Sequence, residues 1–93
     1  MTQLDQRMPR HHPQTASRVF SGEAVIITPA ENMVRMLNPV GSRIWELADG
    51  TRTVEEIAQT LTGEFEVALA KARAHTTAFV DVLAAKGLLI FSE

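Results

Sequence analysis

The chain contains no cysteine, and aromatic residues make up only 5% of its 93 residues. Without cysteine, neither disulfide bonds nor thiolate sites can form, which favours a reducing compartment. The polar N-terminal residues lack the apolar core of a signal peptide, and no segment is long and apolar enough to span a membrane. We therefore expect a cytoplasmic protein that is not inserted in a membrane.

Basic residues are not concentrated in any part of the chain. The 9 Lys and Arg residues are interspersed with 11 Asp and Glu residues, for a net charge of −2. Nucleic-acid-binding proteins carry a basic patch that displaces counterions from phosphates, and this chain has none. The length and the hydrophobic fraction of 45% are those of one small globular domain. The composition thus disfavours a nucleic-acid partner.

Residues that could carry catalytic or metal chemistry are few and lack partners. Ser42 lies near the start of a predicted helix, without the adjacent base that a nucleophile needs. Glu55 and Glu56 match the first turn of another predicted helix, where carboxylates are favourable. His11 and His12 are adjacent but lack the further ligands of a metal site. We expect no catalytic residue, no metal and no cofactor, and hence a protein that is not an enzyme.

Short β-branched runs flank a glycine turn in the first half of the chain. Val19 precedes Ser21-Gly22 and residues 25–27 follow it, which predicts two short strands joined by a tight turn. After the turn-rich residues 29–32, the alternation of residues 33–37 predicts a third strand. This order favours an antiparallel meander with the third strand at its edge.

The predicted third strand is unusually apolar for an edge. Met33, Arg35 and Leu37 lie on one face and Val34 and Met36 on the other, so both faces are partly apolar. Edge strands are normally protected by charge or proline, and only Arg35 interrupts this one. Such an edge is typical of domains that add a peptide strand. An ordinary central strand is the alternative that the pattern leaves open.

Three helices are predicted after the strands. Asn38 and Pro39 fit the cap and first position of a helix that ends before Asp49-Gly50. Thr53, with Glu56 three positions later, forms a capping box that opens a second helix ending near residue 63. An Ala-rich third helix runs from about residue 68 to 86, and Gly87 ends it. The final residues are extended or frayed.

The order of elements defines a fold class. Residues 1–15 are polar and without periodicity, which predicts a flexible N-terminal arm before a domain of residues 16–93. Three strands followed by three helices predict an α+β, winged-helix-like fold, with a three-stranded antiparallel sheet placed first.

Several motifs at fixed spacing resemble the PqqD-like family, the recognition chaperones of ribosomally made, modified peptides. The segment "VRMLNPVGSRIWELADGTRTVEEIAQTL" precedes a long helix that ends in "AAKGLL". The motifs that carry the resemblance are Leu37-Asn38, Ile44-Trp45-Glu46-Leu47, Asp49-Gly50, Thr53 to Ile57 and Gly87-Leu88-Leu89.

The resemblance implies that the leader of a precursor peptide adds as an antiparallel strand to the third strand and packs against the third helix. The bound peptide would be presented to a modifying enzyme, often a radical S-adenosylmethionine (SAM) protein. The implied peptide-binding residues are Met33, Val34, Arg35, Met36 and Leu37 of the strand, and Arg73, Thr76, Thr77 and Val80 of the helix. Many relatives carry an acidic residue where this chain has His75, which predicts a different charge preference.

The sequence also leaves other interpretations open. A winged-helix DNA-binding regulator would need basic residues on a recognition helix, whereas "TVEEIAQTL" has none and carries two Glu residues. A structural subunit would stabilise a modifying enzyme without touching the peptide. An apolar strand edge can also be satisfied by a second copy of the chain, which leaves a homodimer open.

Overall fold

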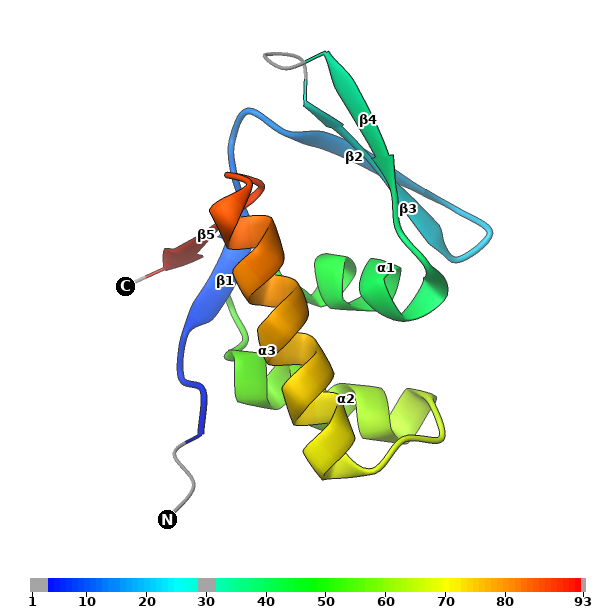
Figure 1. Cartoon of the computed structure of the whole chain (residues 1–93), viewed down its shortest axis with the longest axis vertical. Coiled ribbons are helices and arrows are strands. Elements are labelled where there is room, and N and C mark those ends of the chain that lie inside the picture. Colours follow the sequence, from blue (N-terminus) through cyan, green and yellow to red (C-terminus); the bar gives the residue numbers. More distant parts are fainter. Residues whose placement is uncertain (1–3, 29–31, 93) are drawn as a thin grey trace.

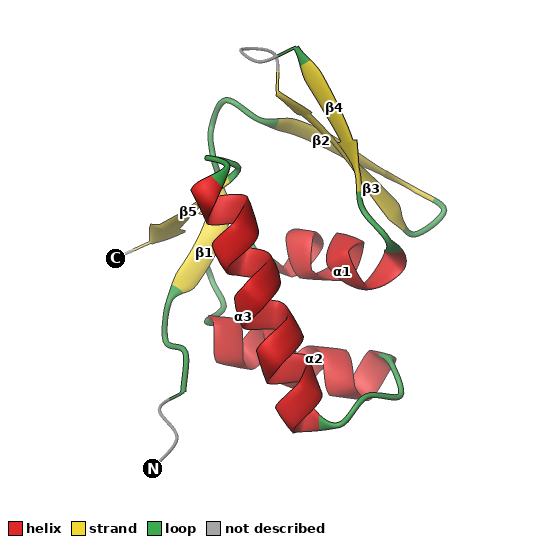
Figure 2. Cartoon of the chain, in the orientation of Figure 1, coloured by secondary structure: helices red, strands yellow, loops and turns green. Residues whose placement is uncertain are grey.

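The computed structural model describes residues 4–28 and 32–92 of the chain (Figure 1). Its helices and strands are, in chain order, β1 (Met8–His11), β2 (Ala16–Phe20), β3 (Glu23–Thr28), β4 (Met33–Met36), α1 (Pro39–Leu47), α2 (Val54–Glu64), α3 (Leu69–Ala85) and β5 (Leu89–Ser92). The predicted α+β class, with a three-stranded antiparallel sheet followed by three helices, is confirmed (Figure 2).

The three-stranded sheet has the order β2-β3-β4, so β4 lies at an edge as predicted. Ser21 and Gly22 both have positive φ angles, 52° and 78°, and form the tight turn between β2 and β3. Residues 29–31, within the turn predicted before β4, lie outside the described part of the chain. Ala24 and Ile26 of β3 are buried, which fixes the face that the sheet turns toward the helices.

The structure differs from the sequence prediction in the N-terminal segment. Met8 to His11 form β1, which pairs antiparallel with β5, and Pro9 is fully buried. The carbonyls of Asp5 and Arg7 also accept hydrogen bonds from the first amides of α2. The predicted arm is therefore part of the fold from residue 4 onward. Its partners lie far away along the chain, so no local pattern reveals the pairing.

The helix caps follow the sequence signals closely. The Asn38 side chain accepts a hydrogen bond of 2.7 Å from the Gly41 N–H, and Pro39 occupies the first position of α1. Thr53 and Glu56 form the complete capping box of α2, with bonds of 2.9 and 3.1 Å. These caps satisfy amides that the helices cannot pair internally. Both predicted helix starts are confirmed.

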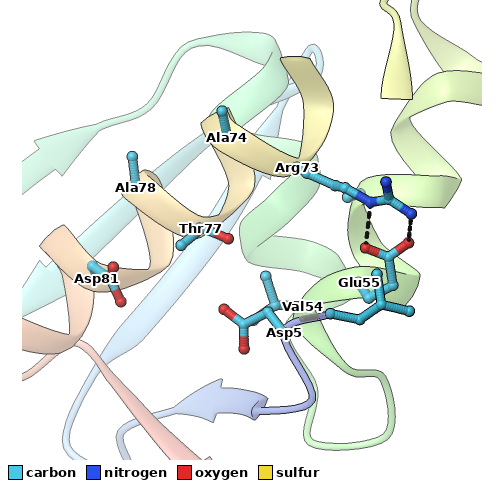
Figure 3. A pocket seen from close by; sticks show the side chains of 10 residues that line it. Asp5, Val54, Glu55, Arg73, Ala74, Thr77, Ala78 and Asp81 are labelled. Carbon is cyan, nitrogen blue, oxygen red and sulfur yellow. Dashed lines mark hydrogen bonds and ion pairs between the residues drawn. The ribbon is translucent and has the colours of Figure 1, made fainter. Parts of the chain in front are cut away.

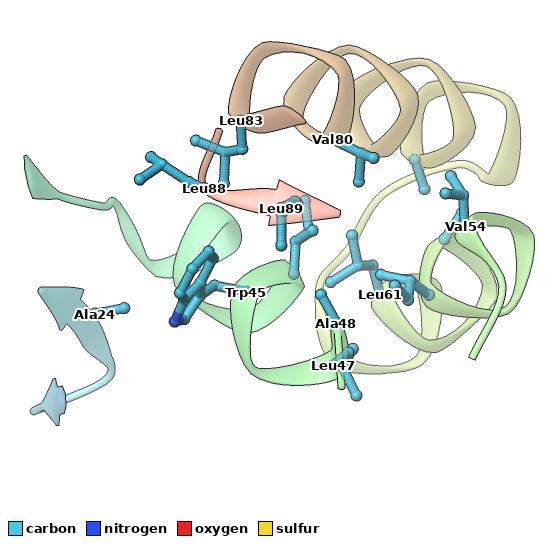
Figure 4. Packing of buried hydrophobic residues seen from close by; sticks show 14 of the residues in the cluster. Ala24, Trp45, Leu47, Ala48, Val54, Leu61, Val80, Leu83, Leu88 and Leu89 are labelled. Carbon is cyan, nitrogen blue, oxygen red and sulfur yellow. The ribbon is translucent and has the colours of Figure 1, made fainter. Parts of the chain in front are cut away.

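The core lies between the three helices, β3 and β5 (Figure 4). Trp45 is its largest side chain and is 1% exposed. Its indole N–H donates to the Ser17 hydroxyl at 3.0 Å, and the His11 ring stacks on it at a centroid distance of 3.7 Å. Trp45 therefore joins the two sheets to α1.

The effect of a buried polar group on the stability of this core can be tested at Thr76. Its side chain is fully buried, and within the described structure its hydroxyl has no hydrogen-bond partner. An unpaired buried hydroxyl destabilises the folded state, so the nearly isosteric Thr76→Val should leave the free energy of unfolding unchanged or raise it by about 1 kcal/mol. Urea unfolding measures the change. The same substitution at Thr53 removes a helix cap and should lower stability by about 1 kcal/mol. A comparable loss at Thr76 would contradict the prediction.

Candidate functional site

The outer edge of β4 carries backbone groups that no other strand pairs within the described residues. The Leu37 N–H donates to the Ala24 carbonyl at 2.9 Å, in line with the β3–β4 register. Alternate residues of an antiparallel strand direct both backbone groups to the same neighbour. Arg35 therefore bonds to β3, whereas the N–H and C=O groups of Val34 and Met36 point outward from the sheet.

The side chains of β4 alternate as the sequence predicted. Val34 and Met36 lie on the face away from the helices and are 65% and 71% exposed. Met33 and Arg35 lie opposite Thr28 and Ile26, on the face turned toward the helices. A strand added to this edge would continue both faces, because its side chains alternate in the same way.

Beside this edge lies a groove between α1 and α3. It has a volume of about 440 Å³. Its lining residues are Asn38, Val40, Gly41, Ile44, His75, Ala78, Phe79 and Val82. Asn38 directly follows the β4–Leu37 segment, so the groove opens where the strand ends. The lining is mainly apolar, and among the described residues that form it only His75 is ionisable. We call this the α1–α3 groove.

Ser42 holds the sheet in place above α1. Its fully buried hydroxyl accepts a hydrogen bond of 2.6 Å from the Ala24 N–H of β3. The same hydroxyl donates to the Leu37 carbonyl at 3.2 Å, at the end of β4. Ser42 therefore has a structural role, and it fixes the β4 edge relative to the groove.

The four predicted peptide-binding residues of α3 do not line the α1–α3 groove. Thr76 and Val80 are fully buried in the core and are not accessible to a peptide in this structure. Arg73 and Thr77 line a different pocket of about 420 Å³, between α3, α2 and the N-terminal segment (Figure 3). The face of α3 that meets the groove carries His75, Ala78, Phe79 and Val82 instead. They share one side of the helix at i, i+3, i+4 and i+7 spacing, and Val82 is 51% exposed. This spacing does not stand out in the sequence, because alanine and other apolar residues occur all around α3.

Arg73 is engaged by Glu55 of α2. The guanidinium donates two hydrogen bonds to the carboxylate, at 2.8 and 2.9 Å. The Glu55 side chain is only 6% exposed, and Gln59 donates a further hydrogen bond to it. The hydrogen bonds from Arg73 hold the pKa of Glu55 below its usual value, although burial acts in the opposite direction. Arg73 thus joins α2 to α3.

Arg73→Met should lower the stability of the protein in a pH-dependent way. The folded-state pKa of Glu55 is lowered, so the ion pair stabilises the protein above the unfolded pKa of about 4.3. This stabilisation is lost as the pH falls through the folded-state pKa. Urea unfolding should therefore show a clear penalty for the variant at pH 7 and a smaller one at about pH 3. An equal penalty at both pH values would contradict this role.

Both histidines of the pair near the N-terminus make contacts with other parts of the folded chain. The His11 ring stacks on Trp45, and its Nε2 lies 2.6 Å from the Trp45 carbonyl oxygen. The Nδ1 of His12 accepts a hydrogen bond from the Gln14 N–H. Residues 4–28 and 32–92 contain no group of three or more potential metal ligands. Within the same ranges, no helix is long and apolar enough to cross a membrane.

A free strand edge beside an apolar groove is the arrangement of small domains that bind an extended peptide. Residues 23–89 match the family described as Coenzyme PQQ synthesis protein D (PqqD), and the chain belongs to this family. The family resemblance deduced from the sequence motifs is confirmed. Among curated proteins, none matches the chain.

Two solved structures have a similar fold. One is "TbiB1 in Complex with the TbiA(beta) Leader Peptide", with 28% identity, a TM-score of 0.79, and coverage of 86% of this chain and 93% of that chain. The other is "Lasso peptide synthetase B1 complexed with the leader peptide", with 22% identity and a TM-score of 0.80. It covers 89% of this chain and 98% of its own, and at this identity it supports the fold alone.

Proposed function

We propose that the protein binds the leader segment of a ribosomally made precursor peptide and presents it to a peptide-modifying enzyme, without catalysing a reaction itself. The observation that carries this proposal is the free outer edge of Val34 and Met36 beside the apolar α1–α3 groove. Family membership and the similarity to TbiB1, which is solved with a leader peptide, support it.

In the proposed complex the leader adds to β4 as an antiparallel strand. Its backbone pairs with the outward N–H and C=O groups of Val34 and Met36, each bond contributing about 0.5–1.5 kcal/mol. Alternate leader side chains then lie on the face of Met33 and Arg35 and enter the α1–α3 groove. Backbone pairing supplies affinity, and the groove selects the register. Because few charges take part, we expect binding to depend only weakly on salt.

The proposed partner is a cytoplasmic enzyme that modifies the rest of the precursor, and a radical SAM protein is the candidate that the family resemblance implies. A homodimer would compete with this function if it formed through β4, because a second copy would occupy the same edge. Leader binding and dimerisation through this edge are therefore mutually exclusive.

A DNA-binding function is disfavoured by the charge of α2. Its first turn carries Glu55 and Glu56, and its last turn has no basic residue. Steeply salt-dependent binding to duplex DNA would support that alternative instead. A purely structural subunit is the other alternative. It would bind the enzyme equally well with and without the leader.

The direct test is to select peptides that bind the purified protein from a display library of random sequences. A selected peptide is then titrated into isotope-labelled protein, and the amide signals are followed by NMR. We expect shifts in residues 33–37 and in the groove-facing residues 75–82 of α3. Failure to select any peptide, or shifts confined to residues 4–15, would overturn the proposal.

Met36→Pro should weaken peptide binding without disrupting the sheet. Proline removes the outward N–H of Met36, whereas the β3–β4 hydrogen bonds use the groups of Arg35 and Leu37. Loss of one backbone hydrogen bond should reduce affinity by roughly 3- to 10-fold. Calorimetric titration of a selected peptide measures the change.

Met36→Ala is the matched control, because it shortens the side chain but keeps the N–H group. Thermal unfolding of both variants shows whether the fold is retained, and Val34→Pro repeats the test at the other outward residue. Equal affinities for folded Met36→Pro and Met36→Ala would exclude backbone pairing at this position.

A further inference from the structure

Gly41 lies in the first turn of α1, at a position where a side chain would collide with α3. A Cβ atom built on Gly41 would lie 2.8 Å from Cε2 and 3.1 Å from Cζ of Phe79. Carbon atoms in ordinary contact are about 3.5–4.0 Å apart. Glycine is also among the least favourable residues inside a helix. Helix formation therefore does not explain Gly41, whereas the close approach of the Phe79 ring does.

The two residues meet inside the α1–α3 groove. Both belong to its lining, and Phe79 is a partly buried side chain packed against the core. The core cluster against which Phe79 packs includes the fully buried Ile44 and Val80, so the core side of the ring is occupied. The open space next to the ring is the groove itself. An added methyl group at Gly41 would therefore push the ring into the groove.

We propose that Gly41 is a positioning residue: it lets the Phe79 ring lie against the backbone of α1 and thereby sets the depth of the α1–α3 groove. The depth in turn sets how large an apolar side chain of a bound peptide can enter. This inference rests on the proposed peptide-binding function and assigns its size selectivity to one contact between α1 and α3.

Gly63 provides a matched control. It lies in α2, and a Cβ atom built there meets no atom within 4 Å. Gly63→Ala is thus the same chemical change in a helix, but without a neighbour to displace. An effect that Gly41→Ala shows and Gly63→Ala does not must come from the atoms that the new Cβ meets, which are those of the Phe79 ring and, at 3.1 Å, the capping Oδ1 of Asn38. Removal of the Phe79 ring tip in a double variant separates these two contacts.

The test measures the affinity of a library-selected peptide by calorimetric titration and thermal stability by circular dichroism. An overpacked contact raises the free energy of a rigid, well-packed state. We expect this cost to fall on the peptide complex and to reduce the affinity of Gly41→Ala for the peptide by about 10-fold. Its thermal midpoint should change little, because the displaced atoms are the tip of a ring and alanine favours the helix. Gly63→Ala should bind the peptide as the original protein does.

Two further measurements identify the cause of the loss. Phe79→Leu introduced into the Gly41→Ala protein removes the ring tip and should restore most of the affinity. Peptides whose groove-facing side chain is shortened should lose less affinity on Gly41→Ala than the selected peptide does. Unchanged affinity for folded Gly41→Ala, or no recovery in the double variant, would overturn the proposal. If both variants failed to fold, the claim that the ring can yield would be wrong.

A measurement without peptide separates this inference from the proposed function. The ring signals of Phe79, and the methyl signals of Val40 and Val82 beside it, should shift in NMR spectra of Gly41→Ala and stay in place in Gly63→Ala. Stationary signals would overturn the positioning role even if peptides bind. Shifted signals without any peptide binder would retain the contact and reject the function.

Discussion

The hydroxyl of Ser42 ties the β4 edge to the helices, and the geometry of the candidate site depends on it. Because it bonds to Ala24 and to Leu37, it holds the centre and the edge of the sheet on α1. Trp45, one turn further along α1, connects the same helix to Ser17 and His11. These contacts fix the position of the sheet relative to α1, and with it the position of the free β4 edge relative to the groove.

Local signals in the sequence predict the parts of the fold that local physics decides. The caps at Asn38 and Thr53 and the alternation of β4 depend on neighbouring residues, and they could be read from the sequence. The β1–β5 pair could not, because Met8 and Ser92 come together only through the complete fold. The family motifs include Asn38 and Ile44 on the α1 side of the groove but none of its α3 residues, so they identified the family without revealing the full groove lining.

The facing of α3 could not be predicted from its composition. Alanine and other apolar residues occur all around this helix, so no single stripe identifies the side that packs. The structure buries Ala72, Thr76, Val80 and Leu83. That choice turns Arg73 toward Glu55 and Phe79 toward α1. The orientation of α3 about its own axis therefore determines which of its residues stabilise the fold and which line the groove.

The two sides of α3 differ in chemistry, and this difference bears on specificity. Ion pairs lie on the side of α2 and the N-terminal segment, where Arg73 meets Glu55 and Arg7 meets Asp81. The groove side offers apolar surface and His75. In the proposed complex, backbone pairing at β4 would not distinguish one peptide sequence from another, and charge would contribute little there. Selectivity in this complex is therefore assigned to the shape of the groove, and the contact between Gly41 and Phe79 lies within its lining.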